Sequence, residues 1–202
     1  MNGFGNPDHA ESRPTRVAAL AGRRPDAPGA KARVFPATSI PHVRSQLRSL
    51  FTEQRIGLLV SSAAAGADLL ALDVADSLGL RRQLVLPFSI DAFQEKSVAD
   101  KAGDWMQLFE RVISHLGPND GLRVLDDVFA NPEDAYSAAS HEILNLSEAY
   151  ARQMESHPPL AVVVWNGTAR RGRDMTAEFR TEAIARSFAV MDVLTTGGHE
   201  LT

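Results

Sequence analysis

The stretch Leu160-Ala161-Val162-Val163-Val164 is apolar throughout and decides the fold class. A strand with one solvent-exposed face alternates apolar and polar side chains, whereas an unbroken apolar run predicts a strand buried on both faces. Polar sequence with two glycines follows directly, over residues 166–172. The run therefore predicts a central strand of a parallel sheet that helices cover on both sides.

The sequence on either side of this run repeats the pattern. Short apolar runs predict further strands at residues 17–21, 56–60, 84–86, 122–125 and 188–194. Apolar residues at helical spacing predict helices over about 40–54, 66–78 and 175–187, and two more helices around residues 105–116 and 139–150. Strands that alternate with helices are typical of parallel sheets with right-handed crossovers. We expect a three-layer, doubly wound, mostly parallel α/β fold of the Rossmann-like type.

The chain has 202 residues, enough for one sizeable core. Residues 16–195 are therefore expected to form a single domain. The polar segment 1–15, rich in Gly, Pro, Asp and Glu, predicts a disordered lead-in, because it cannot bury enough apolar surface to offset the cost of ordering. Residues 196–202 are expected to form a flexible tail.

Composition excludes several classes of partner and site. The net charge of -4 argues against non-specific binding to duplex nucleic acid, for which a basic face is usual. With no cysteine, the chain has no disulfide or thiolate zinc site, and its six histidines lack metal-ligand spacing, so no metal site is expected. Because no apolar run approaches the roughly 20 residues of a membrane span, we expect no membrane partner and a cytoplasmic protein.

In doubly wound sheets, ligands bind beyond the carboxyl ends of the strands, so the loops at these ends are the candidate sites. Gly22, Arg23 and Arg24 follow the first predicted strand. Arginine suits phosphate because its planar guanidinium donates to two oxygens at once. A solvated turn is the alternative interpretation of this loop.

The loop after the second strand is the stronger phosphate candidate. Ser61, Ser62 and Gly66 are small and let a ligand approach the backbone, and the helix that follows offers free N–H groups to an anion. Asp68 is expected to cap this helix or to accept a hydrogen bond from a ribose hydroxyl, since a carboxylate repels phosphate. Tight helix–strand packing is the alternative. In the loop after the third strand, Phe88 or Phe93 could stack on a base, and a place in the core is the favoured alternative.

The segment after Val164 has similar features. Trp165 ends the strand, Gly167 and Gly172 allow tight turns, and Thr176 lies near a helix start, with three arginines between them. These residues are candidate ligand contacts, although a loop rich in arginine is also typical of a solvated surface. No Walker A lysine motif or Gly-x-Gly-x-x-Gly fingerprint occurs, which disfavours a P-loop NTPase and an ordinary dinucleotide dehydrogenase.

Asp174, Glu178 and Glu182 are spaced four residues apart on the last predicted helix and share one face of it. If the protein cleaves an N-glycosidic bond, one of these three carboxylates is the natural acid or nucleophile. A charged outer face of the helix is the favoured alternative.

The runs Gly22 to Pro25, Ser61 to Leu72 and Leu86 to Phe88, with Phe93 and Ser97-Val98 after them, resemble the SLOG superfamily, which includes the DprA and LOG ("lysine decarboxylase-like") families. The resemblance spans about residues 16–195, and the later segments 161–167 and 172–176 match the place of a second glycine-rich phosphate loop in those domains. It implies a Rossmann-like domain that binds a nucleotide or nucleotide-derived ligand. Arg23 replaces a histidine frequent in the first loop, and Phe179 stands where the LOG hydrolase motif has its glutamate.

Three functions stay open at this point. The first is a sensor-type domain whose partner is a small-molecule nucleotide derivative, without catalysis and with no further cofactor assigned. The second is an N-glycosidic-bond hydrolase or deoxyribosyltransferase-like enzyme, and the third is an interaction module that has lost ligand binding. A homo-oligomer also stays open, because parallel α/β domains with short loops commonly pair.

Overall fold

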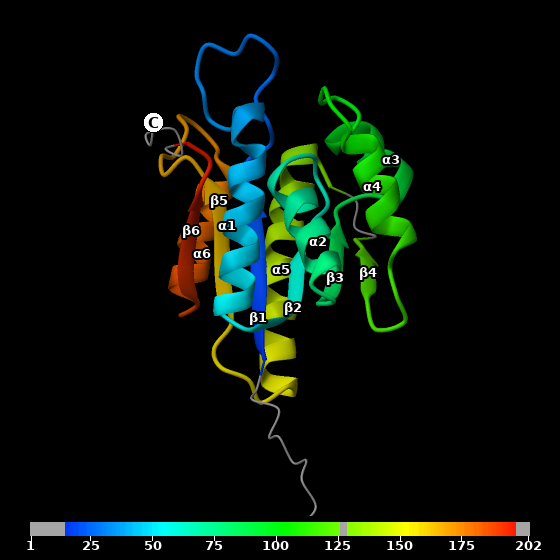
Figure 1. The fold of residues 1–202 in the computed structure, drawn as a ribbon, viewed down its shortest axis with the longest axis vertical. Helices are drawn as coiled ribbons and strands as arrows, with labels where there is room; N and C mark the ends of the chain where they lie inside the picture. Colours follow the sequence, from blue (N-terminus) through cyan, green and yellow to red (C-terminus); the bar gives the residue numbers. More distant parts are fainter. Residues whose placement is uncertain (1–14, 126–128, 197–202) are drawn as a thin grey trace, which may run out of the picture.

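The computed structural model describes residues 15–125 and 129–196, and it contains one six-stranded, all-parallel sheet (Figure 1). The expected lead-in 1–15 and tail 196–202 lie almost wholly outside the described residues. The strands are β1 Arg16–Gly22, β2 Ile56–Ser61, β3 Arg81–Leu86, β4 Gly121–Val124, β5 Leu160–Trp165 and β6 Ala189–Leu194. The helices are α1 Ile40–Glu53, α2 Ala67–Ser77, α3 Ile90–Ser97, α4 Trp105–Ser114, α5 Pro132–Gln153 and α6 Met175–Ala185, with a 3-10 turn η1 over Ala37–Ser39. The expected three-layer, doubly wound Rossmann-like α/β fold is confirmed.

The strand order is β4-β3-β2-β1-β5-β6, and every neighbouring pair is parallel. The first four strands build outward in one direction from β1, and the chain then returns to add β5 and β6 on the other side of β1. The order therefore reverses between β1 and β5. At such a switch point the loops after the two strands diverge, which leaves room for a ligand.

Helices cover both faces of the sheet. Alternate β1 side chains such as Ala18 and Leu20 pack with α1, α2 and α4 on one face, and Val17 and Ala19 pack with α5 and α6 on the other. Every residue of β5 is buried. The unbroken apolar run therefore marks a strand sandwiched between helical layers, as the sequence predicts.

Helix α3 is the main departure from the expected elements, because residues 90–97 are expected to continue a loop. Ser89 caps this helix by accepting a hydrogen bond from the Ala92 amide at 3.4 Å. Only Phe93 and Ser97 of its eight residues are buried, so the helix has almost no apolar period to detect in the sequence. It lies just beyond the carboxyl edge of the sheet, where it forms one wall of the site described below (Figure 1).

Candidate functional site

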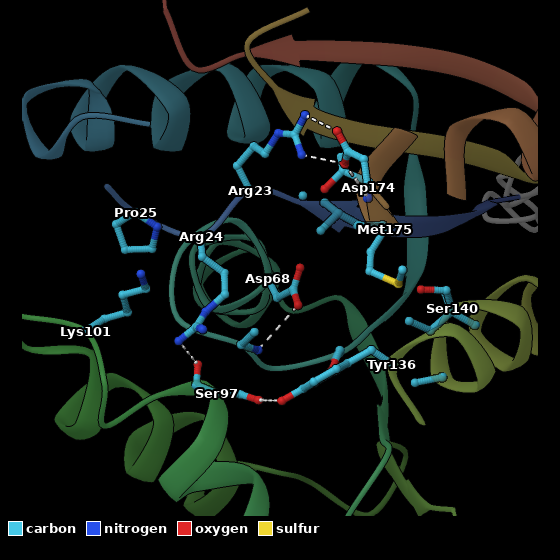
Figure 2. A pocket seen from close by; sticks show the side chains of 18 of the residues that line it. Arg23, Arg24, Pro25, Asp68, Ser97, Lys101, Tyr136, Ser140, Asp174 and Met175 are labelled. Atoms are coloured by element: carbon cyan, nitrogen blue, oxygen red, sulfur yellow. Dashed lines mark hydrogen bonds and ion pairs between the residues drawn. The ribbon is translucent and has the colours of Figure 1, made fainter. Parts of the chain in front are cut away.

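A cavity of about 490 Å³ opens at the carboxyl edge of the sheet, around the switch point between β1 and β5. Its walls come from the segments after β1 and β2, the end of α3, the first turns of α5, and the segment that leads into α6 (Figure 2). The volume lies in the range of small-molecule and cofactor sites. Topology and cavity thus agree on one location.

Seven of the sequence-predicted site residues line this cavity: Gly22, Arg23, Arg24, Ser62, Asp68, Asp174 and Thr176. The cavity lining does not include the other seven, which are Ser61, Gly66, Trp165, Gly167, Gly172, Glu178 and Glu182. Ser61 is fully buried, with its hydroxyl 3.3 Å from the Leu20 carbonyl oxygen. Three loops that lie far apart in the sequence therefore meet, although only part of each loop faces the cavity.

Arg23 and Asp174 form a buried ion pair at the back of the cavity. Arg23 is only 3% exposed, and its Nη1 and Nη2 donate to the two carboxylate oxygens of Asp174 at 2.6 and 2.8 Å. Nη2 also donates to the Thr168 carbonyl oxygen at 2.9 Å. Both terminal nitrogens of Arg23 are thus engaged within the protein, so the arginine expected to bind phosphate instead joins the β1 and β5 loops.

Asp174 is the N-cap of α6 rather than a free acid. It accepts hydrogen bonds from the backbone amides of Arg170, Thr176 and Ala177 at 2.7, 3.1 and 3.2 Å. Burial alone would raise the pKa of this carboxyl, but hydrogen bonds from Arg23 and these amides outweigh burial and hold the pKa at about 2. Asp174 therefore stays ionised and structurally committed, which suits neither an acid nor a nucleophile.

The other two candidate carboxylates do not line the cavity. Glu178 accepts a hydrogen bond from the Asp174 amide at 3.2 Å. Glu182 lies farther along α6, where it pairs with His141 of α5 at 2.7 Å and with Arg186. The three carboxylates are on one helix, as the spacing predicts, but only Asp174 reaches the cavity.

Trp165 ends β5 beneath the cavity and is 8% exposed. The guanidinium carbons of Arg23 and Arg180 lie 6.0 and 5.6 Å from its ring centroid. Such distances are typical of cation–π contacts. The ring thus supports the ion pair of Arg23 and is buried against protein rather than open to a base.

Gly22 and Gly66 let the β1 and β2 loops approach each other closely. A Cβ on Gly22 would lie 2.7 Å from the Cβ of Val164 and would also collide with Ala67. Gly66 has φ +110°, and a Cβ there would lie 2.7 Å from the Arg23 carbonyl oxygen. The two glycines therefore shape the walls of the cavity through backbone packing, which is the alternative that the sequence left open for the second loop.

Asp68 projects into the cavity from the first turn of α2 (Figure 2). Helix α2 has no side-chain cap; instead, Oδ2 of Asp68 accepts from the Ala64 amide at 3.3 Å. Arg24 lies nearby, and its Nη2 donates to the Ser97 carbonyl oxygen at 3.0 Å and pairs with Asp100. Arg24 thus spans from the end of β1 to the end of α3 along the cavity wall.

Several lining residues were not among the predicted ligand contacts: Phe93, Ser97, Lys101, Tyr136, Ser140 and Met175. Ser97 and Tyr136 are joined by a 2.8 Å hydrogen bond between their hydroxyls, which links α3 to α5 across the cavity (Figure 2). Tyr136 belongs to no motif, and only the strand order brings α5 to this edge.

Cationic side chains outnumber carboxylates in the cavity lining, which is unexpected for a chain of net charge -4. The lining has five Arg or Lys side chains (Arg23, Arg24, Lys101, Arg170 and Arg173) and three aspartates (Asp26, Asp68 and Asp174). Among the described residues, no side chain pairs with the ammonium of Lys101 or the guanidinium of Arg170. These two cations are available to an anionic ligand.

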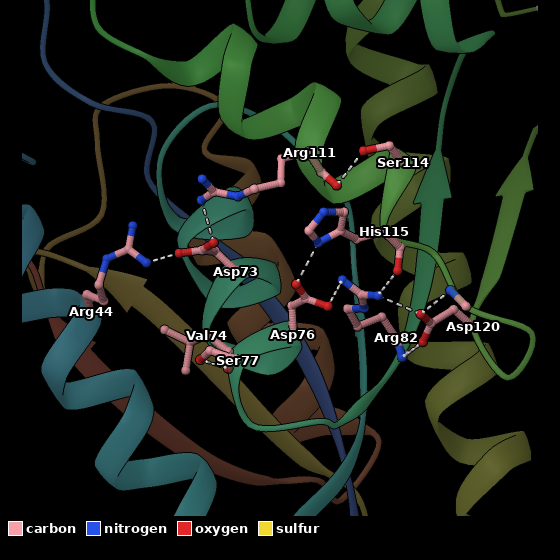
Figure 3. A network of polar contacts seen from close by, with 11 residues as sticks. Arg44, Asp73, Val74, Asp76, Ser77, Arg82, Arg111, Ser114, His115 and Asp120 are labelled. Atoms are coloured by element: carbon pink, nitrogen blue, oxygen red, sulfur yellow. Dashed lines mark hydrogen bonds and ion pairs between the residues drawn. The ribbon is translucent and has the colours of Figure 1, made fainter.

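A second cavity, of about 890 Å³, adjoins the first and shares the segment 25–27 with it. Arg33, Arg44 and Arg111 line it. Arg44 and Arg111 both pair with Asp73 of α2, the latter at 2.6 Å (Figure 3). Arg33 has no partner in the part of the chain that the structure describes. The carboxyl edge therefore carries two contiguous hollows, with two unpaired cations in the first and one in the second.

Arg82 of β3 forms a polar cluster with Asp76 of α2 and with Asp120, which precedes β4 (Figure 3). Arg82 of β3 is 3% exposed, and its guanidinium contacts Asp76 at 2.8 Å and Asp120 at 2.7 Å. Asp120 also accepts from the Gly117 amide at 2.9 Å. This cluster ties α2, β3 and the segment before β4 together and lies outside both cavities.

Within residues 15–125 and 129–196, no group of three or more His, Asp or Glu side chains is arranged to hold a metal ion. Over the same ranges, no helix combines the length and apolar character that a bilayer crossing requires.

Neither a family model nor a curated protein sequence matches the chain. Two solved structures have a similar arrangement of elements, each with a TM-score of 0.43 and 16% identity over 90% of this chain. One is DNA processing protein A (DprA) from Streptococcus pneumoniae, of which the chain spans 59%. The other is DNA processing protein A from Helicobacter pylori, of which it spans 76%, described as having a unique mode of binding single-stranded DNA.

This comparison corrects the expectation about the partner. We expected a small-molecule nucleotide derivative, whereas the Helicobacter pylori protein is described as binding single-stranded DNA, a nucleic acid. The expectation that excludes duplex nucleic acid does not conflict with that description.

Proposed function

We propose that the carboxyl edge of the sheet binds one nucleotide unit of a single-stranded nucleic acid in the first cavity, without chemical turnover. The observation that carries this proposal is the pair of contiguous hollows at the carboxyl edge of the sheet, each with at least one unpaired cation. A strand presents a phosphate at every nucleotide, so a ligand that continues from one hollow into the next meets a cation in both.

Charge supports a single strand over a duplex. Lys101 and Arg170 line the first cavity and Arg33 lines the second, on a chain of net charge -4. A duplex needs a broad basic face, whereas one strand needs only a groove with cations along it. A few unpaired cations in two adjoining cavities fit the requirement of a single strand.

The absence of turnover rests on the carboxylates. Asp174 is held ionised by Arg23 and backbone amides, and neither Glu178 nor Glu182 lines the cavity. An N-glycosidic cleavage needs an acid near the leaving base and a carboxylate or activated water near the sugar. Of the three candidate carboxylates on α6, only Asp174 lines the cavity, and it is committed to Arg23 and to capping α6, so we favour binding alone as the function.

The test is a fluorescence-anisotropy titration with a labelled oligothymidylate, compared with the same strand in a duplex. We expect saturable binding of the single strand and much weaker binding of the duplex. The double variant Lys101→Ala/Arg170→Ala should weaken binding roughly tenfold and flatten its dependence on salt concentration. The matched control is Arg48→Ala/Arg152→Ala, which removes two exposed cations that line neither cavity.

Equal weakening by the two double variants would mean that only net charge matters and would refute a site in the cavity. No binding of the single strand would refute the proposal itself and favour the interaction module. Chromatography of the strand after incubation tests turnover, and release of free base would contradict a binding-only function.

A further inference from the structure

Asp68 has one carboxylate oxygen with a partner and one without. Oδ2 accepts the Ala64 amide hydrogen bond at 3.3 Å, whereas Oδ1 is buried and has no hydrogen-bond partner among the described residues. The residue is 8% exposed and lines the first cavity, with its carboxyl group turned into it (Figure 2). A buried polar atom without a partner costs free energy, so Oδ1 is an oxygen that could gain a hydrogen bond with a ligand in the cavity.

The surroundings of this carboxyl favour its neutral form. Burial raises the pKa of Asp68 to about 7, because it outweighs the opposing effects of the Ala64 amide and the charge of Arg24. The guanidinium of Arg24 is itself engaged with Ser97 and Asp100. The titratable side chains that share the cavity with Asp68 are Arg23, Arg24, Asp26, Lys101, Tyr136, Arg170, Arg173 and Asp174, and none of them is a histidine.

Hydrogen-bond chemistry fixes where the proton of a neutral Asp68 resides. A protonated carboxyl has one O–H donor, and its other oxygen acts only as an acceptor. Oδ2 already accepts from the Ala64 N–H, so the proton belongs on Oδ1, the oxygen that has no hydrogen-bond partner among the described residues. A carboxylate in this place would repel a phosphate group, whereas a neutral carboxyl donates a hydrogen bond to it.

We propose that Asp68 binds the ligand as a neutral carboxylic acid, donating its proton from Oδ1 to a phosphate or sugar oxygen of the nucleotide unit. This inference rests on the proposed function, since it assigns a role within the same cavity. When the carboxyl is ionised beforehand, it takes one proton from solvent as the ligand binds. Asp68 thus becomes a specificity-determining residue that selects ligands with an acceptor oxygen at this point.

The experiment measures the affinity for a labelled oligothymidylate between pH 6 and pH 8. Internal phosphodiesters keep their charge over this range, whereas a terminal phosphate titrates near pH 6, so the strand is made without one. Because only the neutral fraction of Asp68 is competent to donate, the Kd of the wild-type protein should rise about tenfold from pH 6 to pH 8. Asp68→Asn keeps a donor at every pH and should bind with nearly the same Kd across the range.

Asp68→Ala removes the donor and should bind the strand weakly at both pH values. The control is Asp91→Asn, which replaces an exposed carboxylate in the first turn of α3 and should retain the wild-type dependence of Kd on pH. Circular dichroism of each variant at both pH values confirms that the fold is kept. The inference would be overturned if the Kd of Asp68→Asn rises with pH as the wild-type Kd does. The variant would then bind more weakly than the wild type by the same factor at pH 6 and at pH 8.

The two proposals fail in different ways. If the strand binds the wild-type protein with an affinity that is independent of pH, the role of Asp68 is refuted and the binding site stands. If neither the wild type nor any variant binds the strand at pH 6 or pH 8, both proposals are refuted.

Discussion

Arg23 and Asp174 lie 151 positions apart in the sequence and meet in a two-pronged ion pair that bridges the carboxyl ends of β1 and β5. The pair closes the back of the switch point and fixes the start of α6. It therefore positions both the loop that contains Arg24 and the segment that contains Arg170, on either side of the cavity.

Replacing Asp174 by Asn should destabilise the fold. The change leaves the buried Arg23 guanidinium unpaired, which typically costs about 3 kcal/mol, although Asn still caps a helix. The pKa of Asp174 is depressed to about 2, so its contribution is fully present above the unfolded value of 3.8 and is lost as pH falls toward 2. Urea unfolding at pH 7 and pH 3 should show a larger difference between wild type and Asp174→Asn at pH 7. A difference that is equal at both pH values would contradict the ion-pair account.

Removing the Arg82 side chain, which lies outside both cavities, should lower the stability of the fold. Arg82→Ala leaves Asp76, Asp120 and the His115 carbonyl oxygen without their common donor. We expect a loss of about 3 kcal/mol in the free energy of unfolding, measured by chemical denaturation. The neighbouring Arg81→Ala serves as the control, because Arg81 is exposed and should cost less than about 1 kcal/mol. Similar losses for the two variants would show that the cluster adds little.

An alanine at Gly66 should be costly for two reasons. The residue has φ +110°, and the new Cβ would meet the Arg23 carbonyl oxygen at 2.7 Å and Cδ of Pro25 at 2.8 Å. Strain and collision together should lower stability by about 3 kcal/mol or more, measured as a decrease in the denaturant midpoint. The control Gly29→Ala measures the cost of the positive φ alone, since Gly29 has φ +76° with nothing within 4 Å of the added Cβ. This variant should lose only about 1 kcal/mol of stability.

The ligand-free protein should become less stable as Asp68 ionises. The pKa of this carboxyl is raised from 3.8 to about 7, so its stabilising effect is fully present below pH 3.8 and is lost as pH rises to about 7. Asp68→Asn lacks this titration, so the stability of the wild type relative to this variant should fall by on the order of 3 kcal/mol between pH 4 and pH 8. Thermal or urea unfolding of both proteins across this range measures the change. A constant difference would mean that Asp68 ionises normally in the fold.

Much of the sheet follows from local patterns. The apolar run at 160–164 and the runs at 17–21 and 56–60 coincide with β5, β1 and β2 because burial on both faces removes polar alternation. Helix α3 could not be predicted in the same way, since only Phe93 and Ser97 of its residues are buried. A short helix on the rim of a domain leaves too little apolar periodicity to recognise.

The candidate site was only partly accessible to sequence analysis. The carboxyl-end rule led to the edge where the cavity opens and to Arg24, Ser62 and Asp68, which line it. The rule cannot tell which arginine faces a ligand, because the partner of Arg23 lies 151 positions away. Tyr136 was missed for the same reason, since its place in the wall depends on how α5 packs across the sheet.

Binding in the first cavity can be located by NMR, from the backbone amide chemical-shift changes as unlabelled oligothymidylate is added to isotopically labelled protein. We expect shifts concentrated in residues 22–27, 62–68, 97–101 and 170–176, which surround the first cavity, with smaller changes near Arg33 and Arg111. Shifts concentrated at the opposite edge of the sheet, or no shifts at saturating strand, would contradict binding in this cavity.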